Sequence, residues 1–474
     1  MFQAMTYTLR KYTRELKQVL REPLFFISVL ILFLLLILFI IYPLFEAAKL
    51  SLRPEGEFSL GVYKFIFSHS RFKHAILNSI LLGAIVATTA TIIGFIFAYA
   101  LTRAKIPGQK LFKNFVLLPI ISPPFMFALS VILLFGRNGL ITAGLLKLEG
   151  FDVYGLKGLV LVQTIAMFPI AYMTLAGILQ SLNPDLEDCS MNLGAKHLHT
   201  FLTVTLPLAL PGLLASWLLV FVGSLTDFGN PIVLGGNFNV LSVQAYLEFT
   251  GMSNLPRGSA LALLLLVPTI FIFLIQKRVL GKKSYTTITG KSSRRAPKTS
   301  TVLNKILFIA CLLIILFVFM FYITIIAGSF VKLWGINWKF TLDHFTYSID
   351  VGLTTIKNTL ILAIIATPIT ALLGIIIAFL VERKSFPGKR LLEFLSMMSY
   401  AIPGTAVGIG YILAFNKPPF LLSGTALILI ICYVFRDMPV GVEAGIASLK
   451  QISKEIEESS MNLGANISYT FRHI

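Results

Sequence analysis

The sequence SMNLGA occurs twice, at residues 190–195 and again at residues 460–465. An acidic segment precedes each copy, LEDC at residues 186–189 and IEES at residues 456–459. Each copy also follows a long apolar run, at the place where a chain that crosses a membrane returns to water. A membrane chain that carries the same water-exposed segment twice is predicted to offer two docking points to a partner with two-fold symmetry.

Apolar residues dominate the rest of the chain, since 56% of its residues are hydrophobic and only 13% are charged. A soluble domain could not hydrate such a surface, so an integral membrane protein is expected. Apolar runs of about 20 residues match a helix that crosses a bilayer, which predicts an all-α fold. Ten such runs lie at about residues 24–45, 76–100, 115–135, 159–179, 208–226, 260–276, 306–326, 359–381, 392–415 and 421–435. The first has no cleavage site after it, which predicts a membrane anchor rather than a removed signal peptide.

The formal net charge of +19 is distributed in a way that indicates topology and not nucleic-acid binding. Lys and Arg gather near the N-terminus, at residues 103–113, at 277–305 and at 383–390, which lie on one side of the membrane when the spans are counted. The positive-inside rule then places the N-terminus and the linker 277–305 in the cytoplasm, with 227–257 outside. No acidic residue lies between Glu248 and Asp343, so contact of the linker with anionic lipid is a second interpretation.

A direct repeat divides the chain into two halves. Residues 78–135 match 358–415 without a gap, and residues 169–201 match 439–471. Six spans separate equivalent helices, so the halves are expected to share one orientation and to pack around a path along the membrane normal. The predicted divisions are an N-terminal stretch with the first helix and an external loop (1–75), a first repeat domain (76–276), a basic linker (277–305), a helix with an external loop (306–357) and a second repeat domain (358–474).

The repeat also suggests that the second half is incomplete. After its acidic motif the first half continues into two more spans, whereas the second half stops at the counterpart of Val204. About twelve helices are therefore expected for the whole architecture, with ten present, and a chain of this length is not expected to transport. The linker tripeptide Gly290-Lys291-Ser292 lacks the preceding glycine and strand of a phosphate-binding loop, so we expect no nucleotide site in this chain.

Helix signals surround each copy of SMNLGA. Asn183 and Ser453 are placed to cap the start of a short helix, and Gly194 and Gly464 are placed to end it in the left-handed conformation. The prediction is a helix–glycine–helix knob that fits a groove in a partner; the alternative is an amphipathic segment lying on the membrane, for which acidic residues are poorly suited. Asn78 and Asn358 are likewise predicted to cap the helices that they open.

These segments resemble the cytoplasmic coupling loop of binding-protein-dependent ABC importer permeases, whose motif begins Glu-Ala-Ala, reaches Gly six residues after the Glu and ends near Leu-Pro. The second copy has Glu458 and Gly464, and the first has Asp188 and Gly194 followed by Leu206-Pro207. The resemblance implies docking on two copies of an ABC ATPase subunit that bind the ATP, and delivery of substrate by an extracytoplasmic binding protein. The residues to which it assigns ATPase coupling are Glu187, Asp188, Gly194, Glu457, Glu458 and Gly464. The shorter Asp188 predicts docking sites of different strength.

Within that family, the fused layout and the loops TDFGNP (226–231) and LGGNF (234–238) look most like iron(III)-type permeases, with permeases for phosphonate, thiamine or polyamines as alternatives. Asp227 could meet a cation or the binding protein, or could cap a helix end. Arg436 and Asp437 could form a local ion pair or act as a gate.

Two other classes of protein fit the sequence less well. A secondary transporter with parallel repeats would carry membrane-embedded charges for ion coupling, and the predicted spans show no carboxylate relay. An enzyme would need a cluster of reactive side chains at the membrane face. The six histidines show no metal-ligand spacing, and Cys189, Cys311 and Cys432 imply neither a disulfide framework nor a metal site. We therefore expect a transport subunit, without a metal or cofactor of its own.

Overall fold

Almost all regular structure in this computed structural model is helical, which confirms the all-α membrane fold. The structure describes residues 23–148, 150–282 and 300–464. The described strands form two short antiparallel hairpins, β1 (Val331–Leu333) with β2 (Asn337–Phe340) and β3 (Asn416–Lys417) with β4 (Phe420–Leu421). Since a lipid environment offers no hydrogen-bond partners, the backbone within the spans has to be helical.

Eight helices among the described residues are long and apolar enough to cross a membrane, or nine if a bent pair is one span, against the ten expected. The bent pair is Lys389–Tyr400 with Gly404–Phe415, which turn by 106° at Pro403. Proline lacks the N–H that would continue the helix. The expected tenth span lies in α20 (Ala426–Gln451), where Arg436, Asp437 and Glu443 make the helix too polar to count as a span by composition.

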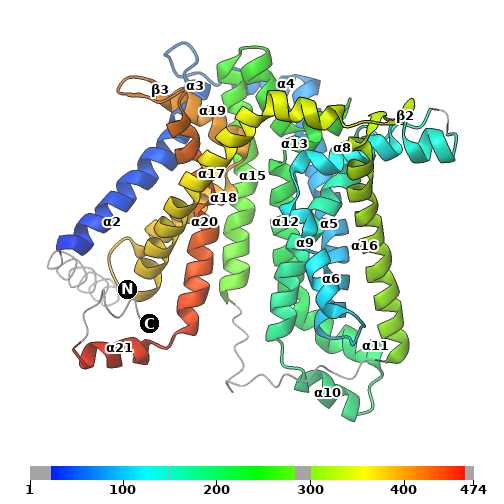
Figure 1. Cartoon of the computed structure of the whole chain (residues 1–474). Coiled ribbons are helices and arrows are strands. Elements are labelled where there is room, and N and C mark those ends of the chain that lie inside the picture. Colours follow the sequence, from blue (N-terminus) through cyan, green and yellow to red (C-terminus); the bar gives the residue numbers. More distant parts are fainter. Residues whose placement is uncertain (1–22, 149, 283–299, 465–474) are drawn as a thin grey trace. The chain divides into compact units, whose positions relative to one another are not determined.

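The described residues form two units, one of which contains Lys49–Gly352 with Pro403–Ala406. Its helix α5 (Ser70–Thr102) packs along α9 (Leu156–Ser181) and α12 (Leu206–Thr226) (Figure 1). At the crossing of α5 and α9, a Cβ on Gly94 would lie 2.7 Å from the Cβ of Ala171, so only glycine permits this approach. The other helices here are α4 (Gly61–Ser68), α6 (Gln109–Phe115), α7 (Leu118–Ile121), α8 (Pro124–Phe135), η2 (Leu140–Leu145), α10 (Asp185–Asn192), α11 (His197–Thr200), η3 (Phe201–Thr205), α13 (Gly229–Leu234), α14 (Leu241–Tyr246), η4 (Leu247–Gly251), α15 (Leu255–Lys282) and α16 (Thr301–Ser329).

The other unit contains the remaining described residues. Its core is Tyr411, Ala414 and Phe415, against which Phe39 and Tyr42 pack. A close helix crossing recurs here, since a Cβ on Gly374 would lie 2.9 Å from the carbonyl carbon of Gly441. Its helices are α2 (Pro23–Leu36), η1 (Ile37–Ile41), α18 (Lys389–Ala401), α20 and α21 (Lys454–Asn462), with most of α17 (Asp343–Arg383), α19 (Gly404–Phe415) and the first part of α3 (Tyr42–Leu52).

The helix before each repeat packs with helices of the other repeat. Helix α16 follows the linker in sequence but packs on α8, where Ser130 Oγ donates to the Phe321 carbonyl at 3.0 Å. Helix α2 and the turn η1 contact α18, and η1 also contacts α20. Each unit therefore combines one repeat with a helix that lies far from it in the sequence.

The prediction that Asn78 and Asn358 cap helices is wrong. Both residues lie inside long helices, α5 and α17, which begin at Ser70 and Asp343. No proline separates those starts from the asparagines, so the helices extend through them. The Asn78 amide instead donates to the Asn239 carbonyl at 3.0 Å and fastens α5 to the chain before α14.

Candidate functional site

The first elbow, residues 183–205, is a helix–glycine–helix turn between α9 and α12 (Figure 1). The Asn183 side chain accepts a hydrogen bond from the Asp185 N–H at 3.0 Å and starts α10, as predicted. Gly194 ends this helix with φ +90°, and its N–H donates to the Met191 carbonyl at 3.0 Å. The Ser190 and Thr200 hydroxyls are hydrogen-bonded at 3.0 Å and tie the two arms together.

Residues 453–464 of the second elbow repeat the first short helix and its glycine in the other unit, and the second arm of this elbow lies outside the described residues. The Ser453 hydroxyl accepts a hydrogen bond from the Glu455 N–H at 3.3 Å and starts α21. Gly464 ends the helix with φ +91°. The predicted caps and glycine breaks are therefore confirmed in both copies. Glu457 and Glu458 lie in α21, but their side chains lie outside the described residues.

Glu187 points into the protein, although its charge predicted a water-exposed position. The side chain of Glu187 lies 3.6 Å from Arg103 Nε and accepts a hydrogen bond from the Thr205 hydroxyl at 2.9 Å. Only 6% of Glu187 is exposed, because the carboxylate can enter the interior when an opposite charge and a donor accompany it. The neighbouring acid, Asp188, is half-buried.

Each elbow exposes a pair of apolar side chains. In the first elbow Leu186 is 49% exposed and Leu193 is 89% exposed, and the matching residues of the second elbow, Ile456 and Leu463, are 51% and 89% exposed. In each elbow one member of the pair lies near the start of the short helix, and the other, Leu193 or Leu463, directly follows its last residue. The predictions from the sequence named the acids of the elbows and did not include these exposed apolar side chains. Their repetition, in segments predicted to face water, is the signal that could have revealed them.

Asp227 is enclosed rather than open to a substrate. Its Oδ2 accepts hydrogen bonds from the side-chain amides of Gln163 and Asn230, both at 2.8 Å, and its backbone carbonyl accepts one from Ser242 at 2.8 Å. The Asn230 N–H lies 3.4 Å from Oδ1, so the carboxylate also supports the start of α13. These contacts hold the loop after α12 in place, and a substrate contact for Asp227 stays a prediction.

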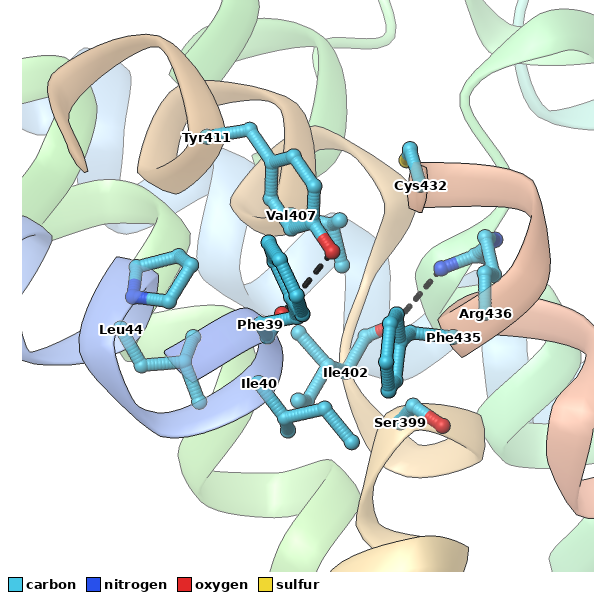
Figure 2. Close-up of a pocket in the computed structure, with 11 residues that line it drawn as sticks. Phe39, Ile40, Leu44, Ser399, Ile402, Val407, Tyr411, Cys432, Phe435 and Arg436 are labelled. Carbon is cyan, nitrogen blue, oxygen red and sulfur yellow. Dashed lines mark hydrogen bonds between the residues drawn. The ribbon is translucent and has the colours of Figure 1, made fainter. Parts of the chain in front are cut away.

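Arg436 supports the bend between α18 and α19 (Figure 2). Its Nη1 donates to the Ile402 carbonyl at 3.1 Å, in the segment where the helix is interrupted. Across the same small cavity, the Tyr411 hydroxyl donates to the Phe39 carbonyl at 2.9 Å. The cavity of about 20 Å³ has room for about one water molecule, so it is not a substrate site.

Comparison with known proteins identifies the family of this chain. Residues 90–285 match the family described as the binding-protein-dependent transport system inner membrane component. The chain is 38% identical to the putative ferric transport system permease protein FbpB 1 of Haemophilus influenzae, over 95% of this chain and 73% of that protein. The chain belongs to the family of binding-protein-dependent transport permeases. It is therefore a multi-pass inner-membrane transport component and not an enzyme.

Other members of the family differ in length from this chain. The ferric transport system permease protein FbpB of Actinobacillus pleuropneumoniae is 38% identical over 92% of this chain, which spans less than two thirds (65%) of that protein. Among solved structures, a bacterial alginate ABC transporter in complex with an alginate pentasaccharide-bound periplasmic protein has a TM-score of 0.49 and 16% identity, over 57% of this chain and 99% of that one.

Proposed function

We propose that this permease belongs to an ATP-driven importer of iron(III), and that its two elbows dock on two copies of an ABC ATPase subunit. The observation that carries this proposal is the repeated elbow. Each copy ends a short helix at a glycine with φ of +90° or +91°, and each exposes an apolar pair at matching positions. Two matching knobs suit a partner with two-fold symmetry. ATP would bind to those partners, and we assign no cofactor to this chain.

The exposed leucines are suited to insertion into a groove of the ATPase. Burying a leucine side chain contributes about 1.5–3 kcal/mol, so Leu193 and Leu463 would each stabilise the docking of one ATPase copy by about that amount. Asp188 and Glu458 would then orient the helix and contribute less, because an ion pair at a protein surface contributes about 0–1 kcal/mol. Closure of the ATPase dimer would move the elbows and rearrange the spans attached to them.

Iron(III) is the substrate that the relatives favour. Two relatives that are 38% identical are named as ferric transport permeases. The TDFGNP loop at 226–231 also resembles the loop of iron(III)-type permeases. In this proposal an extracytoplasmic binding protein selects the substrate, and the loop supported by Asp227 lies where that protein would dock. Phosphonate, thiamine and polyamines remain the alternative substrates, and a secondary transporter the alternative mechanism.

We also propose that both elbows and the linker 277–305 face the cytoplasm. The exposed thiol of Cys189 lies in the first elbow, and Met252 (63% exposed) lies in the segment predicted to be outside. In intact spheroplasts, a membrane-impermeant maleimide should label the Met252→Cys variant at once and Cys189 only after permeabilisation. The buried Cys311 serves as the unlabelled control. Labelling of Cys189 in intact spheroplasts would contradict this orientation.

Substrate uptake tests the function directly. Vesicles that contain the full chain with its ATPase and binding protein should take up radioactive iron(III) when ATP is supplied, and vesicles without the ATPase should not. Phosphonate, thiamine and spermidine are the comparison substrates in the same vesicles. ATP-dependent uptake of one of these compounds and not of iron(III) would identify that compound as the substrate. Uptake without any ATPase would favour a secondary transporter.

A further inference from the structure

Arg103 lies at the junction of three helices. It follows the last residue of α5, and its Nη2 donates to the carbonyls of Leu179 and Leu182, at 2.9 and 3.1 Å. These carbonyls belong to the end of α9, just before the first elbow, where helix carbonyls lack partners of their own. A cation at that end also opposes the partial negative charge of the helix. One side chain thus joins α5 to the end of α9.

The second half contains the same arrangement. Arg383, at the end of α17, donates from Nη2 to the carbonyls of Leu449 and Ile452, at 2.8 and 2.9 Å. These two residues end α20 just before the second elbow, as Leu179 and Leu182 end α9 before the first. Because each contact lies within a separate unit, the structure shows the junction twice, independently.

The junction in the first half extends into the elbow and beyond it. Arg103 Nε lies 3.6 Å from Glu187 in α10, and Glu187 accepts the hydrogen bond of Thr205, which directly precedes α12. The exposed fractions are 3% for Arg103, 6% for Glu187 and 2% for Thr205. A buried charge is costly unless it is paired, so the three groups depend on one another. They hold α5, α9, α10 and the start of α12 in one fixed geometry.

Membrane topology alone does not explain Arg103. The positive-inside rule requires only a positive charge near the end of a span, and an exposed residue such as Lys105 satisfies it. Arginine, in contrast, presents several donors in a planar fork, which lets one guanidinium reach two carbonyls and a carboxylate together. The feature that needs a separate explanation is the buried guanidinium of Arg103, with its contacts to two carbonyls and a carboxylate.

The geometry points to Arg103 and Arg383 as positioning residues that transmit movement of the elbows to the spans. Each arginine fixes the end of the span that leads into its elbow, so a displacement of α10 or α21 carries at least two long helices with it. The inference rests on the proposed docking of an ATPase on the elbows. Its first test measures the mobility of the elbow without any ATPase. A failure of this inference can therefore be distinguished from a failure of the proposed docking.

The first test reports the mobility of the elbow. A nitroxide attached to Cys189, in a Cys432→Ala background with Cys311 buried, reports on α10 in lipid nanodiscs. Arg103→Gln should raise the mobility of the label, and Arg103→Lys should have a smaller effect because lysine cannot fork. Lys105→Gln removes the same charge from an exposed position and should leave the spectrum unchanged. Identical spectra for Arg103→Gln and Lys105→Gln would overturn the inference.

The second test measures coupling in the assembled importer. Arg103→Gln and Arg383→Gln should each lower substrate taken up per ATP hydrolysed by about 3-fold to about 30-fold, the range typical of residues that link two sites. Binding of the ATPase should change by less than that. Thr205→Val removes one hydrogen bond and nearly keeps the shape of the side chain, so it should lower the uptake per ATP by a smaller factor, again with a lesser change in ATPase binding. A parallel fall in ATPase binding and uptake for all three variants would show that the arginines only maintain the fold, and would overturn the inference.

Discussion

The first and the second elbow share a backbone but differ in the acid that follows Leu186 and Ile456 by two residues. In both, the short helix begins at a side-chain cap and is ended by a glycine with φ of +90° or +91°. Both also expose a leucine to 89%, in the same place relative to that glycine. The first has Asp188 where the second has Glu458. Up to the glycine, the short helix and its exposed apolar pair are therefore repeated, whereas the charged side chain varies.

Within the proposed docking, this comparison favours a larger role for the turn and its leucine than for the acid. The two halves differ more inside the membrane, where Arg436 supports the bend in the second half and the matching residue of the first half is Ala166. In the proposed complex, a partner with two-fold symmetry would meet the elbows and not the spans, which would account for the greater likeness of the elbows.

The largest effect is expected from the glycines. Gly194→Val or Gly464→Val places a β-branched residue at a positive φ, which costs about 1–2 kcal/mol or more. ATP-dependent uptake should fall about tenfold or further in each variant, because the elbow can no longer adopt its docking shape. Insertion into the membrane, measured by protein abundance in the membrane fraction, should be unchanged.

Gly177→Ala is the matched control for these variants. A Cβ at Gly177 or Gly194 would meet nothing within 4 Å, but Gly177 has an ordinary helical φ inside α9. Gly177→Ala should therefore transport normally, while Gly194→Ala already loses part of its activity. Normal uptake by Gly194→Val with the ATPase bound would show that the turn is not needed for docking.

A smaller loss is expected from the exposed leucines. Leu193→Ala or Leu463→Ala removes apolar surface that the ATPase would cover, and should weaken ATPase binding about tenfold in each case. Co-purification titrations with detergent-solubilised protein measure this affinity. Leu145→Ala, at a position 71% exposed outside the elbows, is the control and should bind normally. If Leu193→Ala and Leu463→Ala weaken ATPase binding by widely different factors, the elbows are not equivalent docking sites.

The smallest effect is expected from the acids. Asp188→Glu and Glu458→Asp exchange the side chain in which the elbows differ, and each should change the affinity for the ATPase by about threefold at most, as for exposed ion pairs. The effect should shrink further in high salt. A change of tenfold or more from either exchange would mean that the acid, and not the leucine, dominates docking.

The repeat, the helical membrane fold and the elbows could be predicted from the sequence because each depends on local chemistry. Apolar runs of a set length require helices in lipid, and Asn183 and Gly194 act on residues within one turn of themselves. The same local reasoning failed at Asn78, whose amide bonds to Asn239 far along the chain. It also failed to predict the inward position of Glu187.

The sequence alone determined that this protein crosses a membrane several times and carries two elbows of one design. Only the tertiary structure decided which charged side chains are exposed at the surface and which are buried in the interior. Arg103 and Lys105 are indistinguishable as positive charges in one loop, but the first is buried against α9 and the second is exposed. The difference arises because burial of a charge depends on partners that folding brings from elsewhere in the chain, here the end of α9, Glu187 and Thr205.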